Sequence, residues 1–274
     1  MSKRYDLAVL GSPVGHSRSP AMHEAGLAAA GLSGSYVAIE VDEAGMSVQA
    51  ERLRRSQLHG ANITMPHKRT AARLADVLTP TAARACSVNT WYMDGDDLVG
   101  ETTDVHGVRV VFSRRALPSE QILVLGSGGA AAAALVACDG HPVAISARSE
   151  RKAAALLERT GVEAHILDWG SGLRGATVVN ATPIGMRGEH LPEPVVDQAV
   201  AFFDMTYGSE VSPALVATRA EGRPSADGID LLAAQAEESF RIWTGIQPPE
   251  GLFESVARNV SSRPRTSPIQ EGSE

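Results

Sequence analysis

The segment GANITMPHKRT, residues 60–70, brings together side chains that could bind a small polar molecule and pass a proton to it. It contains an amide, a hydroxyl and Pro66, which restricts the backbone just before Lys68. A lysine aimed into a site can donate a proton to an alkoxide and neutralise its developing charge. Most lysines, however, are solvated surface charges, so this segment alone leaves both interpretations of Lys68 open.

A glycine-rich turn, VLGSGGAAAAAL, follows a predicted strand and opens a predicted helix. Gly126, Gly128 and Ala131 have the G-x-G-x-x-G/A spacing of dinucleotide-binding turns. Gly126 would permit the tight turn, Gly128 would let the backbone approach a pyrophosphate, and Ala131 would let the helix pack closely on the sheet. The N–H groups at the start of the helix would then face the phosphates. The turn predicts dinucleotide binding, with a purely structural turn as the alternative.

The end of the next predicted strand indicates which dinucleotide would bind. NAD sites usually carry an acidic residue there, whereas this chain has Arg148, followed by Ser149 and Arg151. A guanidinium forms charge-assisted hydrogen bonds with a 2′-phosphate, so the sequence favours NADP. The alternative is that Ser149 caps a helix and its basic neighbours are solvated.

Composition and charge exclude several classes of protein. The net charge is −7 and the isoelectric point is near 5.6, which argues against binding to nucleic acid or to an anionic membrane. Cys86 and Cys138 are far apart and form no zinc signature, so we expect no metal site and a reducing compartment. The N-terminal segment lacks the apolar core of a signal peptide, and the run from Ala130 to Cys138 is too short to span a bilayer. We expect a soluble cytoplasmic protein, either a monomer or a homodimer.

Strand-like and helix-like segments alternate along the chain. LAVLG, YVAIEV and GANITM read as strands, SPAMHEAGLAAAGL as a helix capped by Ser19, and GMSVQAERLRRSQ as a second helix. The stretch from Ala75 to Asp104 is βα-like. From Gln121 onward, strands alternate with helices, which predicts a parallel sheet covered on both sides. GIDLLAAQAEESFRIWTG is an amphipathic helix with Leu231, Leu232, Ala236, Phe240 and Trp243 on one face.

Seven segments together make a specific pattern. They are GSPVGHSRSPAMH, GANITMPHK, SVNT, GETTD, LGSGGAA, VNATPIGM and DGIDLLAAQAEESFRIWTG, in that order. This set resembles the shikimate dehydrogenase family, which includes quinate/shikimate dehydrogenases, and it covers roughly residues 5–260. The resemblance implies reversible, NADPH-dependent reduction of 3-dehydroshikimate to shikimate in aromatic amino-acid biosynthesis. The alternative is a paralogue with a different substrate or cofactor preference, and a protein that binds nucleotide without turnover is a third possibility.

The resemblance also implies roles for matching residues. Lys68 and Asp104 would form the catalytic pair. The substrate, a ring carrying a carboxylate and hydroxyl groups, would contact Ser17, Ser19, Thr64, Asn89, Tyr207 and Gln235. NADP would contact Gly126, Ser127, Gly128, Gly129, Ala130, Ala131, Arg148, Ser149, Arg151, Asn180, Ala181, Thr182, Met186 and Gly228. Short hydroxyl and amide side chains suit such a ring, although each one taken alone is more often a cap or turn residue.

The implied fold is α/β with two domains and an active site in the cleft between them. Residues 1–104 with 232–262 would form the substrate-binding catalytic domain, residues 105–231 a Rossmann NADP-binding domain, and residues 263–274 a disordered tail. The chain departs from the family pattern at Thr102, where asparagine is usual, and at Ala147, where asparagine precedes the arginine. Glu24 and Ala236 also replace the usual asparagine and glycine. The change at Thr102 affects the turn that places Asp104, so it bears on the rate of the reaction.

Overall fold

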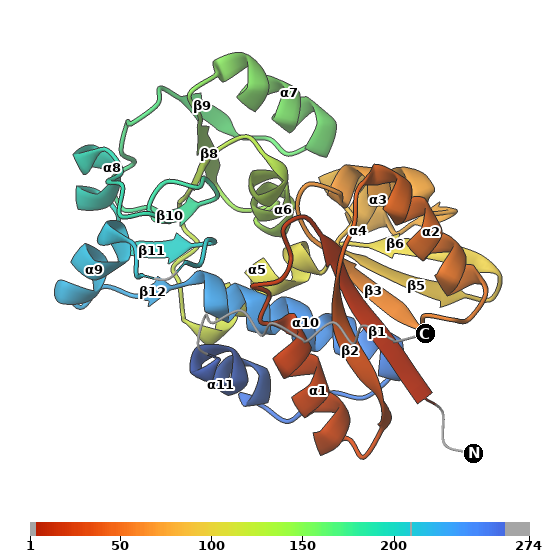
Figure 1. The fold of residues 1–274 in the computed structure, drawn as a ribbon. Helices are drawn as coiled ribbons and strands as arrows, with labels where there is room; N and C mark the ends of the chain where they lie inside the picture. The colour runs from red at the N-terminus through yellow and green to blue at the C-terminus, as the bar shows by residue number, and fades with distance from the viewer. Residues whose placement is uncertain (1–3, 209, 261–274) are drawn as a thin grey trace.

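The computed structural model describes residues 4–208 and 210–260, and they form two lobes (Figure 1). Each lobe is built on a six-stranded sheet. Strands β1 to β6 make the first sheet and strands β7 to β12 the second. Each sheet is therefore built from consecutive strands of the chain. The long helix α10 (Gly228–Thr244) runs past the first sheet and beside α5 (Thr103–Arg114), and thus lies where the lobes meet.

The first sheet has the strand order β2-β1-β3-β5-β6-β4. Its strands are β1 (Arg4–Gly11), β2 (Ser33–Glu40), β3 (Gly60–Ile63), β4 (Val77–Leu78), β5 (Thr90–Asp94) and β6 (Asp97–Glu101). Strands β2, β1 and β3 are parallel, whereas β3 with β5 and β5 with β6 are antiparallel. The stretch expected to be βα-like therefore also contains a hairpin, turned at Gly95 with φ +59°. The Asp94–Gly95 pair is a hairpin signal that the sequence analysis did not use.

Helices cover both faces of this sheet because side chains of β1 alternate between the faces. Tyr5, Leu7 and Val9 pack with α1 (Ser19–Ala29), α10 and α11 (Leu252–Asn259). Ala8 and Leu10 pack with α2 (Glu43–Arg54), α3 (Lys68–Leu74) and α4 (Pro80–Ala85). The N-cap of α1 is Arg18 rather than the predicted Ser19, which is the first residue of the helix; the hydroxyl of Ser17 accepts from the Ser19 N–H at 3.2 Å.

The second sheet is wholly parallel and has the strand order β12-β11-β10-β7-β8-β9. Its strands are β7 (Ile122–Leu125), β8 (Val143–Ser146), β9 (His165–Leu167), β10 (Thr177–Asn180), β11 (Ala201–Asp204) and β12 (Ser225–Ala226). Read from β9, this is the 3-2-1-4-5-6 order of a dinucleotide-binding fold, so the prediction of a parallel sheet is confirmed. The predicted tail, residues 263–274, lies outside the described residues.

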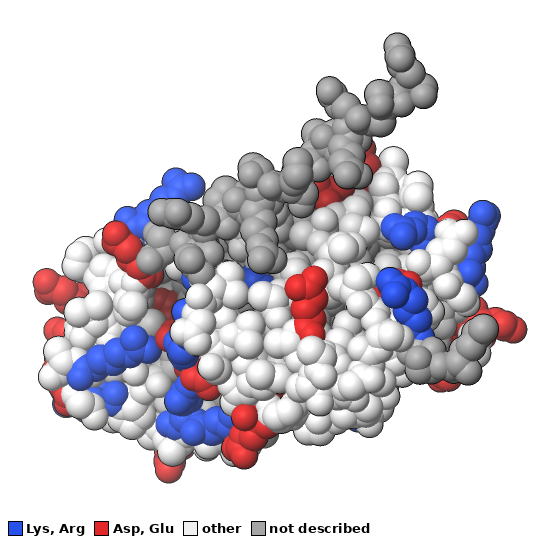
Figure 2. Space-filling view, turned by 60° about the horizontal axis from the view of Figure 1, so that its bottom comes forward, with Lys and Arg blue, Asp and Glu red and all other residues white. Residues whose placement is uncertain are grey.

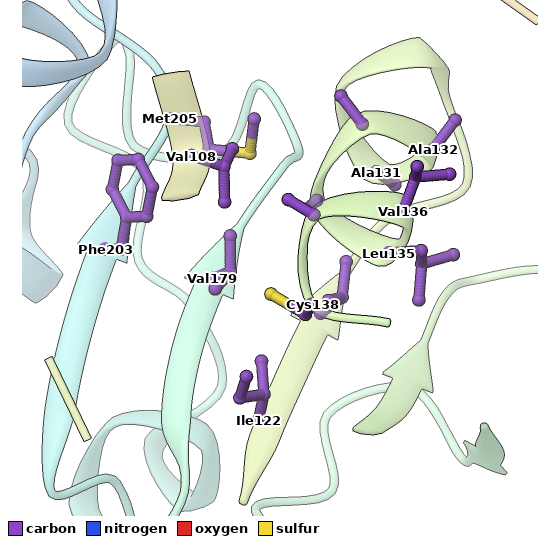
Figure 3. Close-up of a cluster of buried hydrophobic side chains, with 14 of the residues drawn as sticks. Val108, Ile122, Ala131, Ala132, Leu135, Val136, Cys138, Val179, Phe203 and Met205 are labelled. Carbon is purple, nitrogen blue, oxygen red and sulfur yellow. The ribbon is translucent and has the colours of Figure 1, made fainter. Parts of the chain in front are cut away.

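The core of the second lobe shows why its glycine- and alanine-rich helix lies so close to the sheet (Figure 3). Helix α6 (Gly129–Ala137) contributes Ala131, Ala132 and Leu135 to the cluster that also contains Ile122 and Val179, all fully buried. Helices α5 and α7 (Glu150–Thr160) complete this face, while α8 (Glu193–Asp197) and α9 (Pro213–Ala220) cover the other. Small side chains shorten the distance between α6 and β7, which positions the turn between them.

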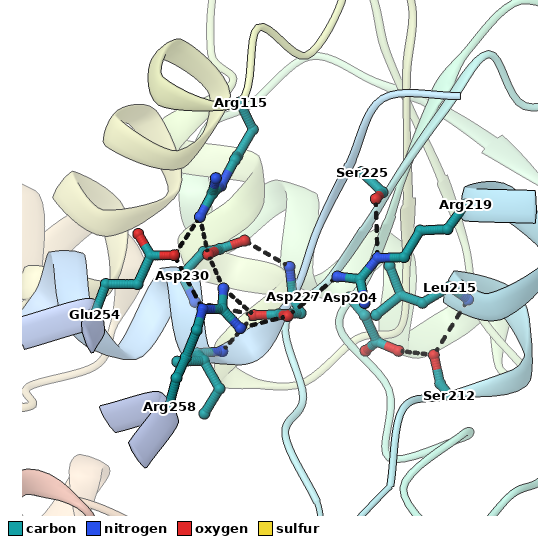
Figure 4. A network of polar contacts seen from close by, with 11 residues as sticks. Arg115, Asp204, Ser212, Leu215, Arg219, Ser225, Asp227, Asp230, Glu254 and Arg258 are labelled. Carbon is teal, nitrogen blue, oxygen red and sulfur yellow. Dashed lines mark hydrogen bonds and ion pairs between the residues drawn. The ribbon is translucent and has the colours of Figure 1, made fainter. Parts of the chain in front are cut away.

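Charged side chains join the helices that connect the lobes (Figure 4). Arg115, at the end of α5, donates to Asp230 at 2.6 Å and to Glu254 at 2.5 Å. Arg258 of α11 donates to the same Asp230 at 2.5 Å and to Asp227 at 3.0 Å. The shared, buried Asp230 therefore ties α5, α10 and α11 together.

The surface carries both signs of charge. On the face shown in Figure 2, basic and acidic side chains lie near one another rather than in one basic area. None of the helices within residues 4–208 and 210–260 combines the length and the apolar character needed to cross a membrane.

Candidate active site

The structure brings Lys68 and Asp104 together. Lys68 is the first residue of α3, and Asp104 lies in the first turn of α5. The ammonium Nζ of Lys68 is 2.5 Å from Oδ2 of Asp104. The aspartate side chain is 5% exposed and that of the lysine 29%, so the carboxylate is buried while the ammonium still reaches solvent. Lys68 is therefore half of an ion pair rather than a solvated surface charge.

The first turns of α3 and α5 place Lys68 and Asp104 next to each other. The carbonyl of Lys68 accepts the N–H of Val88, so the start of α3 is bonded to the chain entering β5. Asp104 sits at the N-terminus of α5, where the helix dipole favours a negative charge. The two lobes thus share the pair: α3 belongs to the first sheet, and α5 packs on the second.

Asn89 is the third member of the cluster. Its Nδ2 donates to Oδ1 of Asp104 at 2.9 Å and to Oγ1 of Thr103 at 3.1 Å. Its Oδ1 accepts from the Thr103 N–H at 2.8 Å and from the Thr90 hydroxyl at 3.0 Å. The amide that was predicted to bind a ring hydroxyl is thus directed at the Asp104 carboxylate.

The other predicted substrate residues come from four separate segments. Ser17 and Ser19 lie at the start of α1, and Ser19 is 7% exposed. Thr64 follows β3, and its methyl group occupies the space that a side chain at Gly11 would need. Gln235 is half-buried on α10, where it lies against Gly107 of α5. Their joint role in binding a substrate stays a prediction.

Tyr207 lies beside a cation. The guanidinium carbon of Arg18 is 5.8 Å from the centre of the Tyr207 ring. Burial raises the pKa of Tyr207 above its usual value, so the phenol keeps its proton at neutral pH. Gly228 is packed against the backbone of Thr206 and Tyr207, where a Cβ would come within 2.3 Å of the Thr206 carbonyl oxygen. Gly228 is therefore needed to seat the Tyr207 segment.

The glycine-rich turn has the shape predicted for it. Gly126 has φ +109°, and a Cβ there would lie 3.0 Å from the Ala181 carbonyl oxygen. Gly128 is exposed and a Cβ there would meet nothing within 4 Å, so the backbone is open to an incoming group. Gly128 is also the N-cap of α6 and has no side chain to bond the first N–H groups of the helix. Ser127, Gly129 and Ala130 complete this open turn.

The turn after β8 presents its arginines to solvent. Arg148 and Arg151 are exposed, and neither forms an ion pair within the part of the chain that the structure describes. The Ser149 hydroxyl accepts from the Lys152 N–H at 3.4 Å and caps α7, as the alternative interpretation of this turn stated. Ala147 is 8% exposed and offers no polar atom. The two guanidinium groups are free to bind an anion.

A buried aspartate that the sequence analysis missed organises the turn after β10. Oδ1 of Asp204 accepts from Asn180 Nδ2 at 3.2 Å, and its Oδ2 accepts from the Ser212 hydroxyl at 2.6 Å. Asn180 Oδ1 accepts from the Thr182 N–H and hydroxyl, at 3.1 and 2.7 Å. Burial raises the pKa of Asp204. An aspartate ending the apolar run AFF was the available signal.

The remaining residues of that turn differ in exposure. Ala181 contacts Gly126, and Met186 is 39% exposed. Asn180 itself is fully buried, and its amide hydrogen bonds to Thr182 and Asp204 shape the turn. The structure describes cavities of about 420 and 650 Å³ in the second lobe near His141, and neither contains a predicted site residue.

Thr102, which stands where the family usually has asparagine, leaves the start of α5 without a side-chain cap. Thr102 is the N-cap of α5, yet its side chain makes no capping hydrogen bond. Its Oγ1 is buried without a partner among the described residues. Asp104 is nevertheless held by Lys68 and Asn89, so the aspartate keeps its place without the cap.

Comparison with known proteins identifies the family of the chain. Residues 9–91 match the shikimate dehydrogenase substrate binding domain, and residues 228–258 match the shikimate 5′-dehydrogenase C-terminal domain. The shikimate dehydrogenase (NADP(+)) of Exiguobacterium sibiricum is 34% identical over 260 residues, covering 92% of this chain and 97% of the relative. That of Archaeoglobus fulgidus is 35% identical over 263 residues, with the same coverage of both chains.

A solved structure supports the same assignment. The crystal structure of shikimate 5-dehydrogenase from Thermus thermophilus in complex with NADP(H) and shikimate superposes with a TM-score of 0.85. It is 32% identical in sequence and covers 93% of this chain and 98% of its own. These relatives and this structure show that the chain belongs to the shikimate dehydrogenase family.

Proposed function

We propose that this protein is an NADP-dependent shikimate dehydrogenase that interconverts 3-dehydroshikimate and shikimate in the biosynthesis of aromatic amino acids. Membership of the family supports the reaction, and relatives at 34–35% identity carry this name. The observation that carries the assignment of residues is the contact of 2.5 Å between Lys68 Nζ and Asp104 Oδ2.

The residues present fit NADP. The exposed backbone at Gly128 and the start of α6 suit a pyrophosphate. Arg148 and Arg151 stand at the end of β8, which is adjacent to β7 in the sheet, and they suit a 2′-phosphate. The bound nicotinamide would supply the hydride of the reaction. The turn Asn180–Ala181–Thr182, which adjoins Gly126, would line the nicotinamide side together with Met186 and Gly228.

Lys68 would move the proton. When the carbonyl of the substrate becomes an alkoxide, the ammonium of Lys68 donates a proton to that oxygen, and in reverse the amine accepts it. Asp104 keeps the ammonium in place, because its buried carboxylate is paired with the Lys68 Nζ. Since Lys68 is 29% exposed, the proton can be replaced from solvent.

Hydrogen bonds to its carboxylate and hydroxyl groups would hold the substrate. Ser17 and Ser19 would donate to the carboxylate, with the Tyr207 phenol as a further donor. Thr64 and Gln235 would bond ring hydroxyls, and Asn89, whose amide donates to Asp104, would lie beside the ring. Groups that hydrogen-bond a hydroxyl discriminate strongly against a ring that lacks it, because the buried donor is then left unpaired.

The domain roles follow from these positions. Residues 1–104 with 232–262 would bind the substrate, and residues 105–231 would bind NADP. Closure of the two domains would exclude water during transfer. We further propose a cytoplasmic location, supported by the two free cysteines, and a monomer or a homodimer.

Initial rates test the function directly. Absorbance of the reduced nicotinamide is followed with shikimate or quinate, each with NADP or NAD. We expect a strong rate only with shikimate and NADP. Preference for quinate or NAD would assign the chain to the paralogue alternative, and no rate in any combination would reject dehydrogenase activity on these ring acids.

A further inference from the structure

The orientation of Asn89 decides how Asp104 is held. Both amide atoms of Asn89 are saturated: Nδ2 donates twice and Oδ1 accepts from the Thr103 N–H and the Thr90 hydroxyl. If the amide were turned over, its NH₂ group would face these two donors and its oxygen would face the carboxylate of Asp104. The donors on Oδ1 therefore point the amide N–H at Asp104.

A series of hydrogen bonds leads toward Asn89 from β2, an edge strand of the first sheet. The Tyr36 hydroxyl donates to Asn62 Oδ1 at 2.8 Å, and burial raises the pKa of Tyr36, so it keeps its proton. Asn62 Nδ2 in turn has three acceptors within reach: Ser239 Oγ at 2.9 Å, Thr90 Oγ1 at 3.1 Å and the backbone carbonyl of Asn89 at 3.2 Å. Asn62 and Thr90 are direct neighbours in the pairing of β3 with β5.

The hydroxyl of Ser239 is oriented by a hydrogen bond within α10. Its proton goes to the Gln235 carbonyl at 3.0 Å, so Ser239 Oγ accepts from Asn62 Nδ2 at 2.9 Å. The single hydroxyl proton of Thr90 is donated to Asn89 Oδ1 at 3.0 Å, and Thr90 Oγ1 also lies 3.1 Å from both Ser239 Oγ and Asn62 Nδ2.

We propose that Asn62, Thr90 and Ser239 are positioning residues: through Asn89 they hold the carboxylate of Asp104 so that its second oxygen meets Lys68. The role rests on the proposed catalytic function of that pair. Thr90 and Ser239 are fully buried, so no water replaces a lost donor at either hydroxyl. Ser239 also makes α10 part of the catalytic apparatus, although it lies 149 residues from Thr90.

Replacing single hydroxyls tests this chain. Thr90→Val keeps the shape of the side chain and removes the hydroxyl that donates to Asn89. Ser239→Ala removes the hydroxyl that accepts from Asn62. We expect kcat to fall roughly tenfold in each, because a misplaced catalytic group costs rate, while KM for NADP stays within about twofold. Thr90→Ser, which restores the hydroxyl, should restore most of kcat. In the double variant the two losses should be less than multiplicative, because both act through Asn89.

The matched control is Thr218→Val. Thr218 is equally buried, and its hydroxyl donates to the Ala214 carbonyl at 2.8 Å within α9, far along the chain from the pair. It should lose a comparable amount of stability and keep kcat. The pH profile of kcat should move in Thr90→Val and Ser239→Ala but not in Thr218→Val.

Each result has a definite meaning. Unchanged kcat and pH profile in Thr90→Val and Ser239→Ala would overturn the proposal, as would failure of Thr90→Ser to restore the rate. If Thr90→Val does not fold, Ser239→Ala and Thr90→Ser carry the test. Lys68→Ala is assayed alongside: turnover in that variant would reject the catalytic pair itself, whereas an inactive Lys68→Ala with active Thr90→Val would reject only the positioning chain.

Discussion

Lys68 and Asp104 are 36 residues apart, and each lies in the first turn of a helix. Neither residue type marks a site by itself, since lysines and aspartates are usually solvated. What distinguishes them is that one carboxylate oxygen meets the ammonium while the other meets Asn89 at 2.9 Å. A carboxylate held at both oxygens has one orientation, and the lysine is held with it.

Removing the ammonium should remove the proton transfer. We expect Lys68→Ala to lower kcat by roughly a hundredfold or more, within the range of general acid–base catalysis, while NADP still binds. Steady-state rates and a nucleotide titration measure the two effects. Arg69→Ala is the control, because Arg69 is the exposed neighbouring cation on α3. Near-normal turnover in Lys68→Ala would exclude Lys68 from the mechanism.

Arg148 should determine the preference for NADP. A charge-assisted hydrogen bond contributes about 1.5–3 kcal/mol, so Arg148→Ala should raise KM for NADP by roughly 10- to 100-fold. KM for NAD, which lacks the 2′-phosphate, should change little. Arg159→Ala, on the last turn of the helix that follows, provides a control for general loss of positive charge. Equal loss for NADP and NAD would contradict this role for Arg148.

Among the elements, the short helix α4 and the turn after it deliver Asn89 to the site. Thr79 caps α4 by accepting from the Ala82 N–H at 3.2 Å, with Pro80 at its start. The helix ends at Cys86, whose φ of 48° and ψ of 39° are left-handed. The turn lies next to the glycine-rich loop, since a Cβ at Gly129 would be 3.8 Å from Ser87 Oγ.

The left-handed cap of α4 should be strained by its side chain. We expect Cys86→Gly to raise the free energy of unfolding by about 0.5–1 kcal/mol, because glycine adopts this conformation without steric cost. Urea denaturation measures the change. Ala83→Gly, in the exposed interior of the same helix, should have the opposite sign and similar size. Destabilisation by both variants would show that the Cys86 side chain contributes more by contact than it costs in strain.

At the scale of the whole molecule, two sheets are held together by helices that belong to both. Helix α10 packs Phe240 and Trp243 on the first sheet, and Leu231 and Ala234 on the second. Arg84 of α4 adds a second link, donating to Asp139 at 2.8 Å and to the Thr160 carbonyl at 3.2 Å. Because Arg84 and Asp139 are partly exposed, this link is weak and suits domains that open and close.

The stability of the molecule should depend on pH through His23. This ring is fully buried, stacks on Tyr36 at 4.3 Å between centroids, and its nitrogens have no hydrogen-bond partner among the described residues. Burial lowers the pKa of His23 to about 3. Above the unfolded pKa near 6.5 neither state binds the proton; below it only the unfolded state does, so stability falls as pH drops from about 6.5 to 3.

The expected change in the free energy of unfolding is large enough to measure. Between pH 7.5 and pH 5 this one ring should lower the free energy of unfolding by about 2 kcal/mol. Urea denaturation of wild type and His23→Phe at both pH values isolates the contribution, since the cost of repacking cancels in the difference. His141→Gln, at an exposed position, should retain the dependence of the wild type. An identical dependence in His23→Phe would show that other groups cause it.

The sequence alone determined the features that rest on local chemistry. The turn at Gly126 to Ala131, the amphipathic helix through Leu231 and Trp243, and the parallel second sheet follow from spacing and periodicity, which act over a few residues. The tertiary structure alone decided which polar groups meet. The β5–β6 hairpin, Asp204 beneath the β10 turn, and the convergence of Thr90, Ser239 and Asn89 on Asp104 depend on contacts between distant segments. Such contacts form when packing of the core places the segments side by side, and no pattern along the chain records them.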